Sequence, residues 1–504
     1  MIKPLLRGAL LLLLLFLAPT LSVSGQTAPR NERQLRRALD KLTSDEDLSN
    51  AFIGVSVINV RTGKELFGKN ADKTMMPASN TKLYTTAAAL DQLGPGFTWS
   101  TSVFADPDRV KGGVLEGNLI IRGSGDPVIG GRFNEGDITQ LFREWADSLR
   151  AAGITTIAGD LVGDDDYFDD LQLGYGWSWD DEPFWYSAEI GALSLNDNSV
   201  DFSIVPTLPG GSAQVSWEPL QTSYVQIRNS TVSVDSTESL DEGYARIRDG
   251  NVMTLTSRVP VGYTERESIA IHNPTKFFLH VMRETLVSSG IAVLGEIVDV
   301  DDLSIKPDYS RTRRLASHTS PDLAAVVEII NKRSHNLYAE QVLKTLGREL
   351  PDPDSEADPG SAAMGWAAGI RTLAAAGVDT SRIQLVDGSG LSRMNYLSPS
   401  MSTSLLQFMW THPDSTVRRV FQQSLPIAGV DGGLQNRMQG SPAEGNARAK
   451  TGSFTGASAL SGYVTSAGGT DMAFSLMMNM FTGSSRAARG LQDAIVETLS
   501  RYRR

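Results

Sequence analysis

The sequence predicts a mixed α/β (α+β) protein in which one domain is interrupted by a large β-rich insertion. Segments 26–96 and 310–504 both alternate strand-like and helix-like patterns. The residues between them read mainly as short alternating strands, with frequent Gly, Asp and Ser at the turns. Because the two outer segments share one type of pattern, we expect them to fold together around the insertion.

The first outer segment predicts two helices and a hairpin. A helix begins in the polar stretch 26–37, which leads into leucines at helical spacing. Residues 51–60 are rich in β-branched side chains and end at the turn 61–63, so they predict a hairpin with residues 64–67. A second helix is predicted over 79–93, where a Gly-Pro-Gly run ends it.

The middle and late parts predict further elements. Alternating side chains predict strands at 114–121 and 213–217, and helical periodicity predicts helices at 138–152 and 276–289. A helical region resumes over 321–350, and the acidic, Pro-containing stretch 350–360 predicts an exposed loop. Near the end, strands are expected at 457–464 and 471–481, followed by a closing helix at 486–501.

The N-terminus has the pattern of a secretory signal peptide. Lys3 and Arg7 precede the apolar run 9–18, and small residues follow it, so cleavage is predicted after Ser24. The alternative is a membrane anchor, but the run is shorter than the roughly 20 residues that a span requires. No other segment reaches that length. We therefore expect a soluble, periplasmic or otherwise extracytoplasmic protein without a stable transmembrane anchor.

Composition excludes several classes of function. The net charge of −12 argues against a nucleic-acid-binding protein, which usually presents a basic face. Cysteine is absent, which excludes disulfides, thiolate metal sites and a cysteine nucleophile. Stability must therefore come from core packing.

Ser79 and Lys82 form the first candidate catalytic pair. They stand in Pro77-Ala-Ser-Asn-Thr-Lys82 at a predicted strand-to-helix junction, and residues i and i+3 share one face of a helix. The lysine can act as a base only if its pKa falls toward 7–8, which requires burial or a neighbouring cation. By itself the spacing also fits a capped helix start with an exposed lysine.

Two further short motifs follow in order. Ser334-His335-Asn336 lies between helical patterns, although such a triplet alone also fits a polar helix cap. Lys450-Thr451-Gly452 occurs once and is followed by Ser453 and a strand. As a functional edge strand it would bind a carboxylate through Lys450 and Thr451, with Gly452 allowing close approach of a peptide. The structural alternative is an edge strand guarded by a lysine.

Other chemistries have little support in this sequence. It contains no Gly-x-Ser-x-Gly elbow, no His-Glu-x-x-His helix and no phosphate-binding Gly-rich loop, and none of its five histidines stands at metal-ligand spacing to another. His335 is expected at a helix start rather than in a catalytic triad. The acidic run 163–170 suits either a cation such as calcium or a solvated loop, and we favour the loop. No metal or cofactor is expected.

The three motifs in this order are the signature of penicillin-binding proteins and serine β-lactamases. The chain resembles D-alanyl-D-alanine carboxypeptidases of the DacB, or penicillin-binding protein 4, type, because 255 residues separate Ser79 from Ser334 and leave room for inserted domains. The resemblance covers the mature chain. Its other matching segments are 123–127, 386–395, 425–432 and 450–455.

The resemblance implies a penicillin-binding/β-lactamase-like transpeptidase fold, an antiparallel sheet flanked by helices, with β-rich inserted domains. Its implied catalytic domain is 26–96 with 310–504. Inserted domain II would be 97–184 with 263–309, and a nested domain III would be 185–262.

The resemblance also implies roles for the motif residues. Ser79 would attack the D-Ala–D-Ala carbonyl of a peptidoglycan stem peptide and form an acyl-enzyme, with Lys82 accepting its proton. Ser334 and Lys450 would relay a proton to the leaving amine, and Asn336 would hold the substrate amide. The route among Lys82, Ser334 and Lys450 stays open.

Binding residues are implied in the same way. Backbone N–H groups of Ser79 and Ser453 would form the oxyanion hole. Arg393 would contact the side chain of the stem peptide's third residue. Asp164 would contribute to the same side-chain pocket as Arg393, and Asp165 is the alternative to Asp164 in that role.

Two other functions remain open from the sequence. A serine β-lactamase shares the acylation step but deacylates rapidly, and a non-catalytic peptidoglycan-binding protein could keep the fold. The expected partners are peptidoglycan stem peptides as substrates and β-lactams as covalent inhibitors. The enzyme would remove the terminal D-Ala as a carboxypeptidase and could also cut cross-links as an endopeptidase. A homodimer is left open as the oligomeric state.

Overall fold

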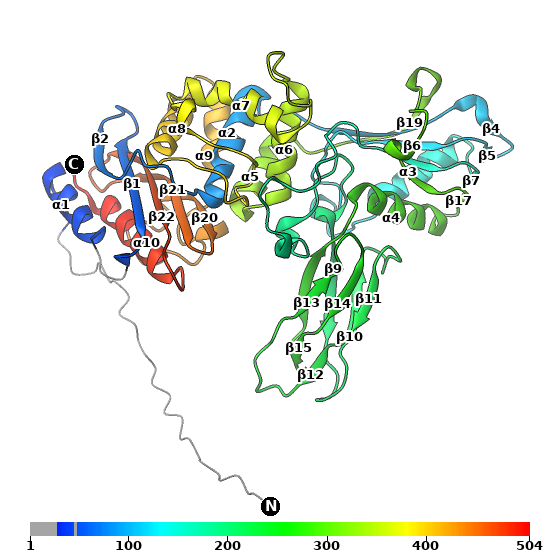
Figure 1. The fold of residues 1–504 in the computed structure, drawn as a ribbon, viewed down its shortest axis with the longest axis horizontal. Coiled ribbons are helices and arrows are strands. Elements are labelled where there is room, and N and C mark those ends of the chain that lie inside the picture. The colour runs from blue at the N-terminus through cyan, green and yellow to red at the C-terminus, as the bar shows by residue number, and fades with distance from the viewer. Residues whose placement is uncertain (1–27, 45–47) are drawn as a thin grey trace, which may run out of the picture.

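The computed structural model describes residues 28–44 and 48–504. The predicted signal peptide, residues 1–24, lies outside the described residues. Figure 1 shows one lobe that contains the first and last helices, a second lobe beside it, and an elongated β lobe that projects from their junction. No helix in the described ranges is both long enough and apolar enough to cross a membrane.

The first lobe is built on a five-stranded antiparallel sheet made from both ends of the chain. Its strands, in spatial order, are β2 (Glu65–Lys69), β1 (Phe52–Asn59), β22 (Asp471–Asn479), β21 (Ala457–Thr465) and β20 (Arg448–Phe454). The predicted hairpin joins the late strands through β1 and β22, where Val55 lies opposite Leu476. β20 forms an edge of this sheet, which is the position where an extended peptide can add a strand.

Helices cover both faces of this sheet (Figure 1). They are α1 (Glu32–Leu42), α2 (Thr81–Gln92), α5 (Leu323–Arg333), α6 (Asn336–Glu349), α7 (Ala362–Ala375), α8 (Pro399–Thr411), α9 (Ser415–Ser424) and α10 (Arg486–Arg501). α1 and α10 pack together on one face, where α1 buries Leu35, Leu39 and Leu42 as its periodicity predicts. On the other face α8 contacts the strands directly.

α2 is the innermost helix of this lobe. α5, α6, α7 and α9 all contact it, and every position from 81 to 90 is buried. A helix that is surrounded in this way has no face in water. Its one lysine, Lys82, is therefore removed from solvent together with the apolar side chains around it.

The second lobe lies between α2 and α5 in the chain and contains two mixed sheets. Their orders are β18-β8-β6-β3-β19 and β17-β7-β5-β4. Helices α3 and α4 pack together beside them through Phe142, Trp145 and Phe278. The elements are β3 (Ser100–Ala105), β4 (Val110–Lys111), β5 (Val114–Leu115), β6 (Leu119–Arg122), α3 (Gln140–Ala151), β7 (Thr156–Ile157), β8 (Leu161–Asp164), α4 (Pro274–Ser288), β17 (Ala292–Val293), β18 (Ile297–Asp299) and β19 (Arg313–Thr319).

The third lobe consists of short strands in three small sheets (Figure 1). The strands are β9 (Ser199–Val205), β10 (Gln214–Glu218), β11 (Gln226–Asn229), β12 (Val232–Val234), β13 (Tyr244–Arg246), β14 (Val252–Leu255), β15 (Arg258–Pro260) and β16 (Glu265–Ala270). Their sheets are β10-β9-β16, β11-β14-β13 and β12-β15.

Several details differ from the sequence patterns, and helices α7, α8 and α9 are elements that those patterns do not predict. The strand expected over 114–121 is two strands, because β5 pairs with β7 in one sheet and β6 pairs with β8 in the other. β19 pairs with β3 in the second lobe, although residue 310 was the predicted return to the outer domain. Chain order cannot reveal this pairing, since the partner strand lies about 200 residues earlier. The exact domain boundaries stay a prediction.

Candidate active site

Ser79 lies in a turn of 3₁₀ helix, Ala78–Asn80, immediately before α2. Ala78 has a positive φ of 47°, and its carbonyl accepts a hydrogen bond from the Thr81 hydroxyl at 3.0 Å. This turn directs the partly exposed Ser79 back over the start of the helix. The Lys82 amine donates to Ser79 Oγ at 3.0 Å, so the two side chains meet as the i, i+3 spacing predicts.

The amine of Lys82 is held in a fully buried polar pocket. Besides Ser79 it contacts Asn336 Oδ1 and the carbonyl of Ser389, both at 2.6 Å. Burial lowers the pKa of Lys82 to about 7, while the carboxyl groups of Asp387 and Glu340 act in the opposite direction. At neutral pH a large fraction of this amine can therefore accept a proton.

The second motif lies at the junction between α5 and α6. Ser334 ends α5 in the left-handed region, with φ of 58°. His335 caps α6 as the sequence predicts, and Asn336 is the first residue of that helix. The Asn336 amide accepts from Lys82 and donates through Nδ2 to the carbonyl of Tyr186 at 2.6 Å. Asn336 thus links the lysine to a segment of the insertion.

Lys450 occupies the buried side of edge strand β20. Its amine donates to Ser334 Oγ and to the Thr451 carbonyl, each at 2.8 Å. Burial, together with the charge of Lys82, lowers the pKa of Lys450 well below its ordinary value. The third motif is therefore joined to the second by a direct hydrogen bond.

Two glycines allow backbone segments to approach the nucleophile turn. A Cβ on Gly452 would lie 2.7 Å from the Pro77 carbonyl and 3.0 Å from the Ser79 nitrogen. A Cβ on Gly390 would lie only 1.9 Å from the Ala78 carbonyl, and Gly390 has a φ of 78°. Any side chain at these positions would displace the turn that carries Ser79.

Two buried acids that the sequence analysis did not single out hold the segment behind Lys82. Glu340 accepts the N–H groups of Gly388 and Ser389 at 2.9 and 2.7 Å, and burial beside Asp387 raises its pKa. Asp387 accepts two backbone N–H groups, the Asn395 amide and the indole N–H of Trp177. The sequence signal for Glu340 was an acidic residue one helical turn after Asn336, in a helix whose residues from 336 to 347 are all buried.

Residues of all three motifs line a cleft of about 480 Å³ between the first lobe and the insertion. Arg393 lines it, donating to the Thr455 carbonyl at 3.2 Å and lying 4.9 Å from the Phe454 ring. The other predicted residues on its wall are Ser79, Ser334, Asn336, Thr451, Gly452 and Ser453. Lys82 and Lys450 lie directly behind Ser79 and Ser334. The structure thus brings nine of the predicted residues together.

Asp164 is the exception. It ends β8, where it pairs with Arg122 at 3.6 Å and accepts a hydrogen bond from Tyr309, and it does not line the cleft. Its alternative, Asp165, accepts from Thr275 and does not line the cleft either. The carboxylate on the wall is Asp181, which accepts from the Tyr186 hydroxyl at 2.8 Å.

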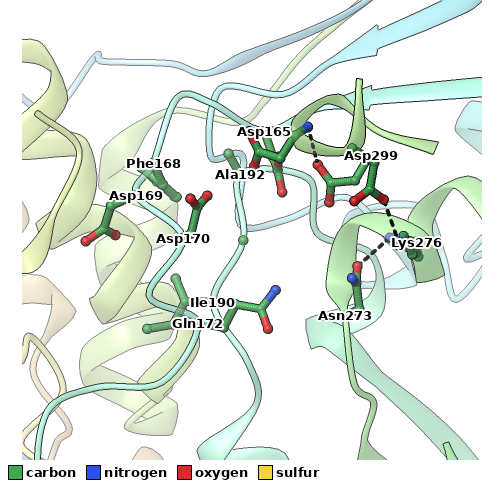
Figure 2. Close-up of a pocket in the computed structure, with 13 residues that line it drawn as sticks. Asp165, Phe168, Asp169, Asp170, Gln172, Ile190, Ala192, Asn273, Lys276 and Asp299 are labelled. Carbon is green, nitrogen blue, oxygen red and sulfur yellow. Dashed lines mark hydrogen bonds and ion pairs between the residues drawn. The ribbon is translucent and has the colours of Figure 1, made fainter. Parts of the chain in front are cut away.

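The acidic run that suggested a cation or a solvated loop lines a separate pocket, shown in Figure 2. Carboxylates of Asp165, Asp299 and Asp301 come within 4.8 Å of one another there. Burial, together with the charges of Asp299 and Asp301, raises the pKa of Asp165 to about 7. Lys276 pairs with Asp302 at the side of the same pocket. This pocket shares no lining residue with the cleft.

Comparison with known proteins identifies the family. The model of the D-Ala-D-Ala carboxypeptidase 3 (S13) family matches residues 35–502. The chain belongs to this family. A D-alanyl-D-alanine carboxypeptidase of Actinomadura sp. (strain R39) is 32% identical over 485 residues, which are 93% of this chain and 85% of that protein. The D-alanyl-D-alanine carboxypeptidase DacB of Haemophilus influenzae is 27% identical over 85% of this chain and 86% of its own.

Solved structures agree with the assignment to the S13 family. The crystal structure of H. influenzae penicillin binding protein 4 (dacB) superposes with a TM-score of 0.76 at 25% identity, over 92% of this chain and 99% of that one. The same protein complexed with a β-lactam gives a TM-score of 0.70 at 26% identity, over 91% and 97%. The predicted fold class and enzyme class, a serine-type D-Ala-D-Ala carboxypeptidase of cell-wall remodelling, are confirmed.

Proposed function

We propose that Ser79 is the nucleophile of this carboxypeptidase and that neutral Lys82 activates it. The observation that carries the proposal is the 3.0 Å hydrogen bond from a fully buried amine, whose pKa is lowered to about 7, to Ser79 Oγ. An exposed lysine is protonated at neutral pH and cannot accept the hydroxyl proton. A lysine at a helix start that served only as a cation would stay in water, because burial of its charge costs free energy.

In the acylation step, Ser79 Oγ bonds to the carbonyl carbon of the penultimate D-Ala, and its proton passes to Lys82 Nζ. The backbone N–H groups of Ser79 and Ser453 stabilise the oxyanion, a term worth roughly 3–4 kcal/mol per donor. The C–N bond then breaks as a proton from the Lys450–Ser334 pair reaches the leaving nitrogen of the terminal D-Ala. The proton that Lys82 took from Ser79 returns to the Lys450–Ser334 pair, which leaves Lys82 neutral again. Water then attacks the ester, its proton passes to Lys82, and Lys82 gives that proton to Ser79 Oγ as the ester bond breaks.

The substrate lies along edge strand β20 in this proposal. Thr451 and the following residues of β20 line the cleft, so an extended peptide can pair with the strand while its terminal carboxylate reaches Thr451. Asn336, which lines the cleft between Lys82 and the Tyr186 carbonyl, holds the substrate amide. The opposite end of the strand, near Arg393, receives the earlier residues of the stem peptide.

We assign the acidic part of the side-chain pocket to Asp181 in place of Asp164. Asp181 and Arg393 both line the cleft, one anionic and one cationic, and together they suit a third residue whose side chain carries an amine or an amine with a carboxylate. This pairing would favour stem peptides over short acylated D-Ala-D-Ala mimics. The substrate belongs to the cell wall, which agrees with the export expected from residues 1–24.

Two assays test the proposal. Purified enzyme should release D-Ala from a pentapeptide stem and should form a stable adduct with a fluorescent penicillin that Ser79→Ala cannot form. Rapid turnover of the penicillin without D-Ala release would instead indicate a β-lactamase. Absence of both labelling and D-Ala release would indicate a non-catalytic binding protein.

A further inference from the structure

A second groove, of about 550 Å³, continues from the cleft on the far side of Ser334. The groove and the cleft share three wall residues, Trp185, Arg333 and Ser334. The groove is bounded by the first lobe on one side and by loops of the insertion, including Asp197, on the other. The reacting centre is therefore open at this end rather than closed behind Ser334.

The position of this groove relates it to the leaving group. Ser334 Oγ is bonded to Lys450, and this pair is the proton donor to the leaving nitrogen in the proposed mechanism. Gly433 lines the groove beside Thr451, since a Cβ at Gly433 would lie 2.7 Å from Thr451 Oγ1. Arg393 lines the cleft but not the groove. The groove therefore lies on the side of the cleft where the terminal carboxylate of the substrate would bind, and away from the side near Arg393 that would receive the acyl part.

The groove is basic although the whole chain carries a net charge of −12. Arg132, Lys332 and Arg333 line it, against the single carboxylate of Asp197. Arg132 pairs with Asp197, and Lys332 pairs with Asp431 at 2.6 Å. Within residues 28–44 and 48–504, Arg333 is exposed and makes no side-chain hydrogen bond or ion pair. Arg333 is the cation left available to a ligand.

We propose that this groove binds the leaving-group peptide of cross-linked peptidoglycan and that Arg333 pairs with a carboxylate of that peptide. The inference rests on the proposed function and assigns the place where the leaving half of a cross-linked substrate binds. When the terminal D-Ala leaves, the departing group is one amino acid that ends near Thr451. When a cross-link is cut, the departing amine belongs to a second stem peptide, which extends past Ser334 and carries acidic groups that the basic wall can hold.

The test compares two substrates of the full enzyme: a linear pentapeptide stem and a cross-linked dimer of two stem peptides. Arg333→Gln should lower the ratio of kcat/KM for the dimer to kcat/KM for the pentapeptide about tenfold, the size expected for one charge-assisted hydrogen bond. Arg333→Lys should keep the ratio within about threefold, because the charge remains. The matched control is Arg419→Gln, an exposed arginine on α9 that lines neither cavity and should leave the ratio unchanged.

A second readout separates charge recognition from a structural effect. Amidation of the carboxylates on the leaving peptide should reduce wild-type cleavage of the dimer by a similar factor and should abolish the difference between wild type and Arg333→Gln. The wild-type ratio should also fall with rising salt, since an exposed ion contact is screened. An unchanged ratio, or an equal loss on charged and amidated dimers, overturns the inference.

The two proposals fail differently. If the enzyme releases D-Ala from the pentapeptide but does not cut the dimer, or cuts it without dependence on Arg333, only the groove assignment fails. If Ser79 is not acylated by penicillin and the pentapeptide is not cut, the proposed function itself fails.

Discussion

The inner and outer walls of the cleft are built from different kinds of structure. The inner wall includes Asn336, and Lys82 and Lys450 lie directly behind it. These residues stand on two buried helices and a sheet strand, and each amine is fixed by at least two hydrogen bonds. The outer wall is made by irregular chain of the insertion, including Asp181 and Trp185 in short 3₁₀ turns. The two lysines and Asn336 therefore sit on rigid elements, whereas the residues proposed to choose the substrate sit on connecting segments.

The largest effect is expected on the inner wall at Ser79. Ser79→Ala removes the atom that forms the acyl bond, so D-Ala release should fall at least about a thousandfold. The adduct with fluorescent penicillin should disappear on a denaturing gel, while near-ultraviolet circular dichroism stays native. Substantial labelling of the variant would show that another residue is the nucleophile.

Lys82→Arg should cost almost as much, roughly 10²–10⁴-fold in acylation rate, because arginine keeps the charge but does not release its proton. In the wild type, kcat/KM should rise about tenfold per pH unit below pH 7 and level off above it, since only the neutral amine accepts the proton and its pKa is lowered to about 7. Stopped-flow acylation measured across pH checks both. A rate that falls as pH rises through 7 contradicts the assigned role.

The contact between the lobes can be broken at Lys344, a buried residue of α6. Its amine pairs with Asp169 of the insertion and donates to the Leu171 carbonyl at 2.7 Å. Lys344→Met leaves a largely buried carboxylate without its partner, so the free energy of unfolding should fall by about 3 kcal/mol. Urea denaturation measures this loss.

The matched control for Lys344 is the exposed pair of Lys111 and Glu116, whose atoms lie 2.9 Å apart. Lys111→Met should change the free energy of unfolding by less than about 0.5 kcal/mol, because water screens such a pair. Equal losses in the two variants would mean that the Lys344 contact does not join the lobes energetically.

The outer wall should show the smallest effect and the greatest selectivity. Asp181→Asn should lower kcat/KM about tenfold for stem peptides with a free amine on the third residue, the size of one lost charge-assisted contact. Acetylation of that amine should remove the difference from wild type. Asp164→Asn, the alternative from sequence, should not alter this preference, and the reverse result would restore Asp164 to the pocket.

The positions of the residues singled out from the sequence follow the same division. Ser79 and Lys82 were predictable because their spacing of three residues is read within a single helical turn, and the ordered motifs supplied the rest. Asp164 was chosen from an acidic run on resemblance alone, and its side chain instead pairs with Arg122 on the neighbouring strand. Asp181 carried no comparable signal, since its place at the cleft depends on how the insertion folds back over α6.

The sequence by itself determined the enzyme class, the order of the motifs and most elements of the outer segments, because periodicity and short motifs are local properties of the chain. Helices α7, α8 and α9 were not among the predicted elements. Only the tertiary structure decided how deeply Lys82 is buried, which lowers its pKa, and which carboxylate lines the cleft together with Arg393. It also decided that the cleft opens past Ser334 into a basic groove. These properties arise between segments far apart in sequence, and no local pattern encodes the distance between them.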